Sequence, residues 1–478
     1  MIVNLKYLKP HARWNVIIPL VLGTWISGSA NGFYVNGEGK FRVRYITADT
    51  TDITGSYGEA LKQGMSLRWR FDISGGYPLA DYFLTEAGLR VTNENSTGAL
   101  YPPDYITGKA VAGWWAISYL REPMEITLGK YDASFTPLTL MRWDTKDNPL
   151  GASGCACQIS VGGISGESLE EPREDYELEG AKIKATAGFG DLTALFAQPQ
   201  VPVEGMFYQQ YLAGGRTRIV LSPFKAGRSM VIGLSALRVK DEPSSVATAP
   251  LAPLQSDVFG VDLNLPLVGD LNLAGEGAFS IRDDNLISGL NPIREGYGLI
   301  AGLQYIQADR VEANLAYLHL DPWFSPFYRA LSYAKNRRGG KFSLIYRDLN
   351  IFNKPFTFSL YFKDWNEIEP TWNETITEWH HALQNFVTAN AGVNMNFTGN
   401  WHIEADYEYR STKRPDDIAT LADEAIDDLT QIVSLILSYE VTLQTKLLIK
   451  GQVIDHVDNA GENDYRAYIP MLQFALKF

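Results

Sequence analysis

Hydrophobic and polar positions alternate with a period of two along most of this chain. In residues 65–73, every second position is apolar and every intervening position is polar or charged. Similar alternation runs through residues 386–398 and 401–410. Because successive side chains of a β-strand point to opposite faces of its sheet, each segment is predicted to be a strand with one apolar and one polar face.

The connections between the predicted strands alternate between short and long. Short turns are expected at residues 121–123, 189–191, 268–270, 308–309 and 398–400. Long polar connections are expected around residues 47–61, 93–108, 132–178, 199–213, 240–256, 282–295, 321–339, 365–385, 413–428 and 456–464. Outer-membrane barrels have this asymmetry, with tight periplasmic turns and long external loops, whereas the connections of a β-sandwich tend to be of similar length. The pattern therefore predicts an all-β fold, a single antiparallel transmembrane β-barrel of about 20 strands, with about 18 as the alternative.

Composition agrees with this prediction without deciding it. The chain has 478 residues, of which 12% are aromatic and 20% charged. A single closed sheet can contain a chain of this length, so no second domain is needed. The net charge of −13 argues against a nucleic-acid partner.

Two loop segments, 373–385 and 421–429, have a helix-like pattern, with plain loop as the alternative.

The first 30 residues have the organisation of a secretory signal peptide. Lys6, Lys9 and Arg13 precede an apolar run over residues 14–26, which is too short for a membrane helix. Small residues follow and end at Ala30. We expect cleavage after Ala30, which would leave residues 31–478 as an exported barrel; a short membrane anchor is the alternative.

The C-terminal end of the chain carries a second pattern typical of a targeting signal. Leu472, Phe474, Leu476 and Phe478 alternate with less apolar residues. A terminal phenylalanine that closes such a strand resembles the C-terminal insertion signal of Gram-negative outer-membrane barrels.

Two internal segments extend this resemblance to Gram-negative porins. They are Asn36–Tyr45, which would be the first strand, and Ile126–Lys130, which looks like the strand before the third external loop of porins. A fainter similarity is to wider barrels of the alginate-export type. The resemblance implies a homotrimer and a long loop that folds into the barrel and narrows it. It implies no catalytic residue.

If the apolar faces contact lipid, the polar faces line the lumen. A charge that faces lipid near the bilayer midplane costs about 2–4 kcal/mol, so charged strand positions are predicted to point inward. The predicted basic lumen residues are Arg42, Arg44, Arg68, Arg70, Arg90, Arg216 and Arg218. The predicted acidic lumen residues are Glu404, Asp406 and Glu408.

The longest predicted loop, over residues 132–178, is rich in acidic residues. They include Asp144, Asp147, Glu170, Glu171, Glu174 and Asp175. Facing an arginine wall, these carboxylates would create a transverse field across a constriction, and such charges select permeant ions. The alternatives are an exposed loop that bridges lipopolysaccharide through divalent cations, and a plug that closes the pore.

The two cysteines of the chain, Cys155 and Cys157, also lie in this loop. In an oxidising compartment they could form a strained local disulfide, remain free or pair between molecules. A Cys-x-Cys pair alone supplies two ligands, so a metal ion is the least favoured reading, and we expect no metal. We also expect no cofactor, because no haem-attachment motif is present.

Catalysis has weak support in the sequence. Asp455 and His456, with Asp458 nearby, could form an acid–base pair, but no serine motif accompanies them. An enzymatic barrel would require that activity be lost on His456→Ala.

These observations predict an outer-membrane porin. It would let small hydrophilic solutes diffuse passively, with a modest preference for anions, and its surroundings would be membrane lipid and lipopolysaccharide. The first alternative is a dedicated channel for an anionic polymer or an organic acid. The second is a barrel that serves as a scaffold for periplasmic partners.

Overall fold

A computed structural model describes sixteen stretches of the chain. They are residues 33–49, 64–93, 110–141, 175–200, 208–224, 228–246, 252–287, 293–307, 310–325, 336–351, 354–369, 372–373, 378–379, 383–415, 425–461 and 464–478. The expected signal peptide and both cysteines lie outside these residues.

Within the described residues, one sheet contains 20 strands. They are β1 (Tyr34–Ala48), β2 (Gly64–Ala80), β3 (Phe83–Thr92), β4 (Ala110–Arg121), β5 (Met124–Ala133), β6 (Tyr176–Ala187), β7 (Gly190–Gln200), β8 (Gln209–Phe224), β9 (Arg228–Glu242), β10 (Gln255–Pro266), β11 (Leu271–Asp283), β12 (Arg294–Gln307), β13 (Val311–Leu320), β14 (Arg337–Ile351), β15 (Lys354–Glu367), β18 (Asn385–Thr398), β19 (Trp401–Arg414), β20 (Ile426–Thr442), β21 (Thr445–Asp458) and β22 (Tyr465–Lys477). A short 3-10 helix, η5 (Pro243–Ser245), follows β9, and β16 (Trp372–Asn373) pairs with β17 (Glu378–Trp379) between β15 and β18.

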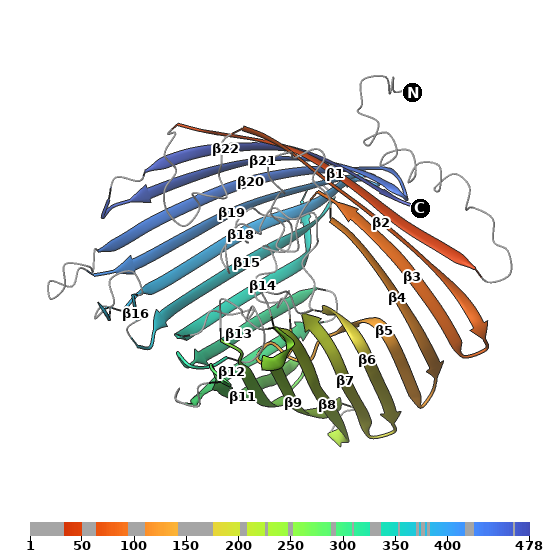
Figure 1. Ribbon diagram of the computed structural model, residues 1–478. Coiled ribbons are helices and arrows are strands. Elements are labelled where there is room, and N and C mark those ends of the chain that lie inside the picture. The colour runs from red at the N-terminus through yellow and green to blue at the C-terminus, as the bar shows by residue number, and fades with distance from the viewer. Residues whose placement is uncertain are drawn as a thin grey trace.

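The sheet closes on itself (Figure 1). Each strand pairs antiparallel with the next, and β1 pairs with β22 in a register that places Arg42 opposite Gln473. The predicted antiparallel barrel and its count of 20 strands are confirmed, and the alternative of about 18 is wrong. All five expected short turns lie where consecutive strands are joined by two to four residues. Every expected long connection lies where more residues join the strands.

The outer face of the barrel is apolar and exposed. On β1, Phe41, Val43 and Tyr45 are exposed, while Lys40 on the opposite face is buried. Met65 on β2 is 75% exposed, and the other strands continue the band. An apolar surface this continuous is unusual on a soluble monomer, and a bilayer would cover it. No helix among the described residues is long and apolar enough to cross a membrane.

Phe478 takes part in closing the barrel beside β1. Its backbone N–H donates to the Gly37 carbonyl at 3.0 Å, and the Gly37 N–H donates to the Phe478 carbonyl at 2.8 Å. A Cβ at Gly37 would overlap the Phe478 ring, so glycine leaves room for the ring to lie over β1. The insertion signal itself stays a prediction.

The helix-like patterns were misleading where the structure describes them. Residues 378–379 belong to β17, and residues 426–429 begin β20. In β20, pairing with two neighbouring strands overrides the local pattern.

Candidate functional site: the lumen wall

The long loop after β5 begins inside the barrel. Phe135, Leu138 and Leu140 are buried, with 6%, 0% and 0% exposure. They belong to one apolar cluster with inner-face side chains of several strands, among them Leu212 of β8 and Leu318 of β13. In this part of the wall, apolar side chains share the inner face with the polar ones. Here the loop covers the wall, so apolar side chains are buried rather than wet.

Three charged side chains of the wall hold this loop segment, and we call them the loop clamp: Arg216, Asp262 and Glu276. Glu276 accepts hydrogen bonds from the Thr136 hydroxyl at 2.5 Å and from the backbone N–H of Leu138 at 3.0 Å. Arg216 donates to the Phe135 carbonyl at 2.6 Å and pairs with both oxygens of Asp262 at 2.8 and 2.9 Å. Arg216, predicted as a pore-lining cation, thus anchors the loop.

A β-ribbon formed by the ends of β5 and β6 leaves the barrel wall. Gly129 and Gly180 pair directly, with φ values of +98° and +154°. The pairing of β4 with β5 stops at Gly129, and that of β6 with β7 stops at Gly180. Beyond them, residues 130–133 and 176–179 pair only with each other among the described strands; we call these residues the inward ribbon.

Glycine is required at the bend because the neighbouring backbone lies very close. A Cβ at Gly129 would overlap the Trp115 carbonyl, and one at Gly180 would overlap the Phe196 carbonyl. On one face of the inward ribbon, Tyr131 packs into the apolar cluster and donates its hydroxyl to the Phe196 carbonyl at 2.8 Å. The ribbon thereby places the start of the loop in the lumen.

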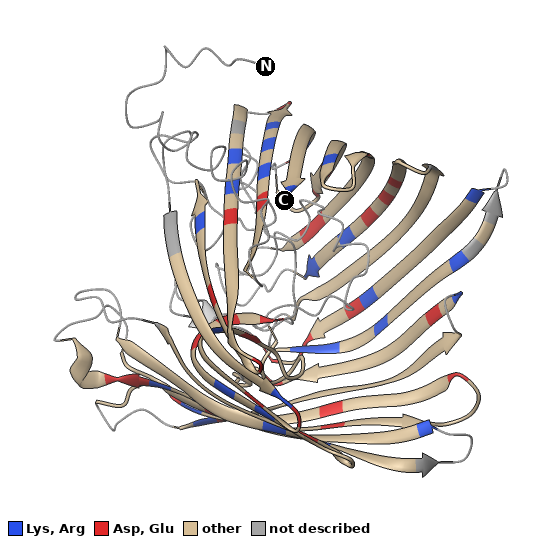
Figure 2. Cartoon of the chain, turned by 90° about the vertical axis from the view of Figure 1, so that its right-hand side faces the viewer, with Lys and Arg blue, Asp and Glu red and all other residues tan. Residues whose placement is uncertain are grey.

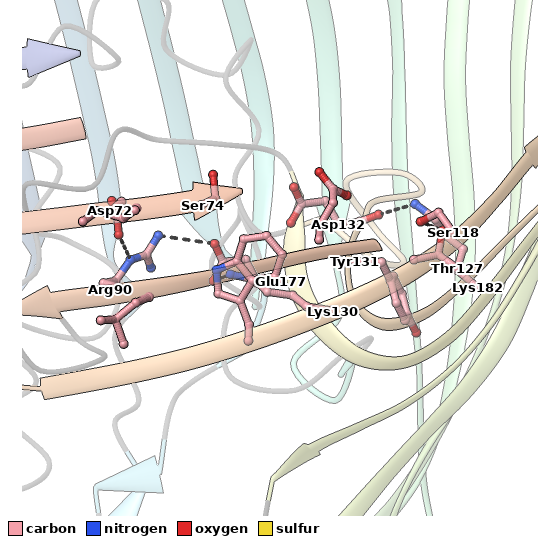
Figure 3. A pocket seen from close by; sticks show the side chains of 14 residues that line it. Asp72, Ser74, Arg90, Ser118, Thr127, Lys130, Tyr131, Asp132, Glu177 and Lys182 are labelled. Carbon is pink, nitrogen blue, oxygen red and sulfur yellow. Dashed lines mark hydrogen bonds and ion pairs between the residues drawn. The ribbon is translucent and has the colours of Figure 1, made fainter. Parts of the chain in front are cut away.

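The other face of the inward ribbon and the wall formed by β2, β3 and β4 enclose a recess (Figure 3). Its volume is about 500 Å³. A row of ion pairs lines it: Asp72 to Arg90 at 2.7 Å along the wall, Glu177 to Lys130 at 3.1 Å along the ribbon, and Arg90 to Glu177 at 3.5 Å between the wall and the ribbon. Trp114 forms part of its lining, with the Lys130 ammonium 5.0 Å from the centroid of the indole ring.

The strongest basic region of the wall lies on β1 and β2. We call it the basic wall: Lys40, Arg42, Arg44, Arg68 and Arg70. Figure 2 shows Lys and Arg gathered on neighbouring strands and a run of Asp and Glu on another strand. The register places Arg42 opposite Arg68 and Lys40 opposite Arg70, while Arg42 donates to Gln473 at 2.8 Å and Arg70 to Asp72 at 2.5 Å. Like charges directly opposite each other are destabilising, so two such rows favour a nearby negative charge.

The predicted acidic residues lie together on β19, on the face opposite the exposed Tyr407. Asp406 and Glu408 are buried, and Glu408 forms an ion pair with Arg410. Lys450 of β21 is also buried, and its charge acts on Asp406. These carboxylates therefore lie within a packed part of the barrel that also holds Arg410 and Lys450.

The remaining predicted site residues have separate positions. Arg90 lies in the recess, and Arg218 pairs with Asp191 at 3.4 Å beside the β6–β7 turn. Asp175 accepts a hydrogen bond from the Ser134 hydroxyl at 2.6 Å, so it ties the two ends of the loop together. The other five acidic loop residues, Asp144, Asp147, Glu170, Glu171 and Glu174, lie outside the described residues.

Asp455 and His456 point to opposite faces of β21. Asp455 pairs with Arg466 at 2.6 Å on an exposed surface. His456 is buried, contacts the Thr430 hydroxyl at 2.9 Å and stacks on Tyr465. The suspected acid–base pair is thus not assembled. In the described part of the chain, no three His, Cys, Asp or Glu side chains gather closely enough to hold a metal ion.

Sequence reasoning missed the residues that shape the lumen. The pairing of Gly129 with Gly180 and the contact of Lys130 with Trp114 depend on register and on the inward bend. One available signal is the loss of alternation at Leu195, Phe196 and Ala197, where both faces are apolar because the inner face is covered.

Comparison with known proteins gives structural likeness only. No protein-family model matches the chain, and no curated protein matches it. The structure is similar to the outer membrane protein OpdK from Pseudomonas aeruginosa, with a TM-score of 0.45 and 10% identity over 93% of this chain and 99% of that chain. For OccAB4 from Acinetobacter baumannii the TM-score is 0.42, with 10% identity over 93% and 98% of the two chains. For the outer membrane protein OprD from Pseudomonas aeruginosa it is 0.39, with 10% identity over 94% and 96%.

Proposed function

We propose that this chain forms an outer-membrane channel through which small hydrophilic solutes diffuse passively. The observation that carries the proposal is the closed barrel of 20 strands with an apolar outer face and charged rows on its inner face. A barrel of about 8 strands is filled by its own side chains, whereas barrels of about 16–18 strands leave an aqueous channel. A barrel of this width therefore has room for water and solutes beside the loop start, residues 134–141, that it contains.

The proposed location in the outer membrane follows from the apolar outer face of the barrel and from its paired strand edges. A closed barrel pairs every strand edge, so its backbone can cross hydrocarbon without unsatisfied polar groups. Export through the expected signal peptide would deliver the chain to the outer membrane. There the outer leaflet would bring lipopolysaccharide against the external rim. The homotrimer implied by the porin resemblance belongs to this proposal, and the mass of the protein in detergent tests it.

The anchored position of the loop start supports the proposal that the lumen contains a constriction. The loop clamp and the apolar cluster hold residues 134–141 against the inner wall. This loop start takes up part of the lumen and brings permeating solutes closer to the charged side chains of the wall. Selectivity is then electrostatic filtering, with no chemical step.

The basic wall gives the channel a preference for anions. A unit charge about 10 Å from an ion in water contributes about 0.4 kcal/mol, which is about a twofold change in local anion concentration. Removing two charges that face each other across β1 and β2 should therefore lower the local anion concentration about fourfold at low salt, and the anion selectivity should fall with it.

The test is single-channel recording in a planar bilayer under a salt gradient. The wild type should open in stable steps with an anion-favouring reversal potential. The double variant Arg42→Gln, Arg68→Gln should lose most of that preference. Arg347→Gln is the matched control, because Arg347 pairs with Glu312 at 3.3 Å beside the β14–β15 turn. A folded wild-type protein that never conducts would overturn the proposal, and equal selectivity in all three proteins would overturn the role of the basic wall.

A further inference from the structure

The recess behind the inward ribbon differs in charge from the basic wall beside it. Four carboxylates and three cations line it: Asp72, Glu86, Asp132, Glu177, Arg90, Lys130 and Lys182. Its volume of about 500 Å³ falls within the range of small-molecule sites, roughly 300–1,000 Å³. The lining is thus rich in charged groups and nearly neutral in total.

The charged groups neutralise one another and still reach the open space. The side chains of Asp72, Arg90 and Glu177 are 27%, 25% and 25% exposed, although each is in an ion pair. A paired carboxylate keeps further acceptor positions, and a paired guanidinium or ammonium keeps further N–H donors. The recess therefore offers both donors and acceptors without a strong net field.

This combination discriminates between classes of solute. A free anion gains more from the field of the basic wall, where Arg42 lies opposite the buried Arg68. A zwitterion would have to displace existing partners to form its own ion pairs. A neutral polyhydroxylated solute needs no excess of positive charge and does not have to break an ion pair. Each of its hydroxyls both donates and accepts a hydrogen bond and replaces a water molecule.

The remaining lining suits such a solute. Ser118 and Thr127 lie 3.2 Å apart on β4 and β5 and present hydroxyl groups. Trp114 lies against the wall, since a Cβ at Gly88 would overlap its indole ring. Trp114 is half-buried, with the Lys130 ammonium 5.0 Å from the ring centroid, and its exposed part gives the recess an apolar surface on which the carbon-bound hydrogens of a sugar ring can pack.

We propose that the recess is a binding subsite for neutral polyhydroxylated solutes, sugars above all, on the wall of the channel. The inference deepens the proposed function by naming a class of solute. Charge-assisted hydrogen bonds to the ion-paired row hold the hydroxyls, and the indole contacts the ring. Binding is weak enough for release, as permeation requires.

The test combines calorimetry and channel recording on the full chain folded in detergent. Maltose is the probe, with succinate and arginine as charged comparison solutes. Wild-type protein should bind maltose saturably and show maltose-dependent current block. Glu177→Gln and Trp114→Ala should each weaken binding about tenfold, since each removes a principal contact. Glu404→Gln, an inner-face carboxylate outside the recess, should bind maltose like the wild type.

Each result decides the question separately from channel activity. A heat-modifiable gel shift first establishes that every protein is folded. No maltose binding to folded wild type, wild-type affinity in both recess variants, or tighter binding of succinate in the recess would overturn the subsite. Calorimetry does not need a conducting pore, so a silent channel would count against the proposed function while leaving the subsite measurable.

Discussion

At the residue scale, one glycine decides whether the loop can lie on the wall. A Cβ at Gly260 would lie 2.6 Å from the Thr139 methyl group and 2.6 Å from the Ser235 hydroxyl. Gly260→Val should therefore push the loop start off β10 and change the single-channel conductance. Gly277→Val on β11 is the control, because a Cβ there meets nothing within 4 Å. Equal conductance in the two variants would contradict the packing of the loop on β10.

The buried carboxylate of the loop clamp allows a second prediction. Glu276→Ala leaves the buried Leu138 N–H without its acceptor, which costs about 1–3 kcal/mol, while the Thr136 hydroxyl keeps only the Thr139 hydroxyl as a partner. The loop start should then detach more often, and single-channel traces should show more frequent current fluctuations. Glu312→Ala removes an inner-face carboxylate paired with Arg347 and should leave the traces unchanged. Quiet traces from Glu276→Ala would show that the clamp does not hold the loop.

The residue scale also shows where sequence reasoning stopped. Alternation identified the two faces of each strand, so Arg216 could be placed on the polar face of its strand. Alternation does not reveal partners, and the bonds of Arg216 to Phe135 and Asp262 come from a loop 81 residues away and a strand 46 residues away. A cation expected to meet permeating ions is instead a structural anchor.

At the element scale, the β5–β6 ribbon depends on its paired glycines. Gly129→Ala would place a Cβ against the Trp115 carbonyl at a φ of +98°, which costs about 1 kcal/mol or more. The ribbon should straighten toward the wall, and the conductance should rise as the lumen widens. Gly188→Ala in the β6–β7 turn meets nothing within 4 Å and serves as the control. Unchanged conductance in folded Gly129→Ala would show that the bend does not set the width of the lumen.

Strands and turns were predictable because they follow local rules. Period-two alternation and short polar turns identified the element type and the order along the chain. The inward bend was not predictable, because it exists only when Gly129 faces Gly180 across two strands. The inner apolar cluster has the same origin, since it forms where a loop covers the wall.

At the scale of the whole molecule, charge distribution predicts a salt dependence. The basic wall lies on the inner face of the barrel, with Lys40 and Arg68 buried, and mobile ions of the lumen screen its field over about 10 Å at 0.1 M salt and about 3 Å at 1 M. Anion preference, measured as the reversal potential at a fixed tenfold gradient, should fall as the mean salt concentration rises. A preference that does not change with salt would point to a narrow binding ring in place of a charged wall.

The closed barrel is also the level at which the sequence was most informative. Strand count, closure and an apolar outer face follow from a pattern repeated along the entire chain. The electrostatics of the lumen could be anticipated only in outline. Net basic character was visible in the strand sequences, but the pairing of Asp72, Arg90 and Glu177 within one recess required the three-dimensional arrangement.

The most direct test of the account is solute flux through the purified, refolded protein in liposomes. Swelling in iso-osmotic solutions of uncharged solutes reports an open, water-filled path without any effect of charge. A water-filled diffusion channel should give swelling that is much faster than in protein-free liposomes, and faster for a pentose than for a trisaccharide. Swelling no faster than in protein-free liposomes, from protein that shows a heat-modifiable gel shift, would contradict a diffusion channel.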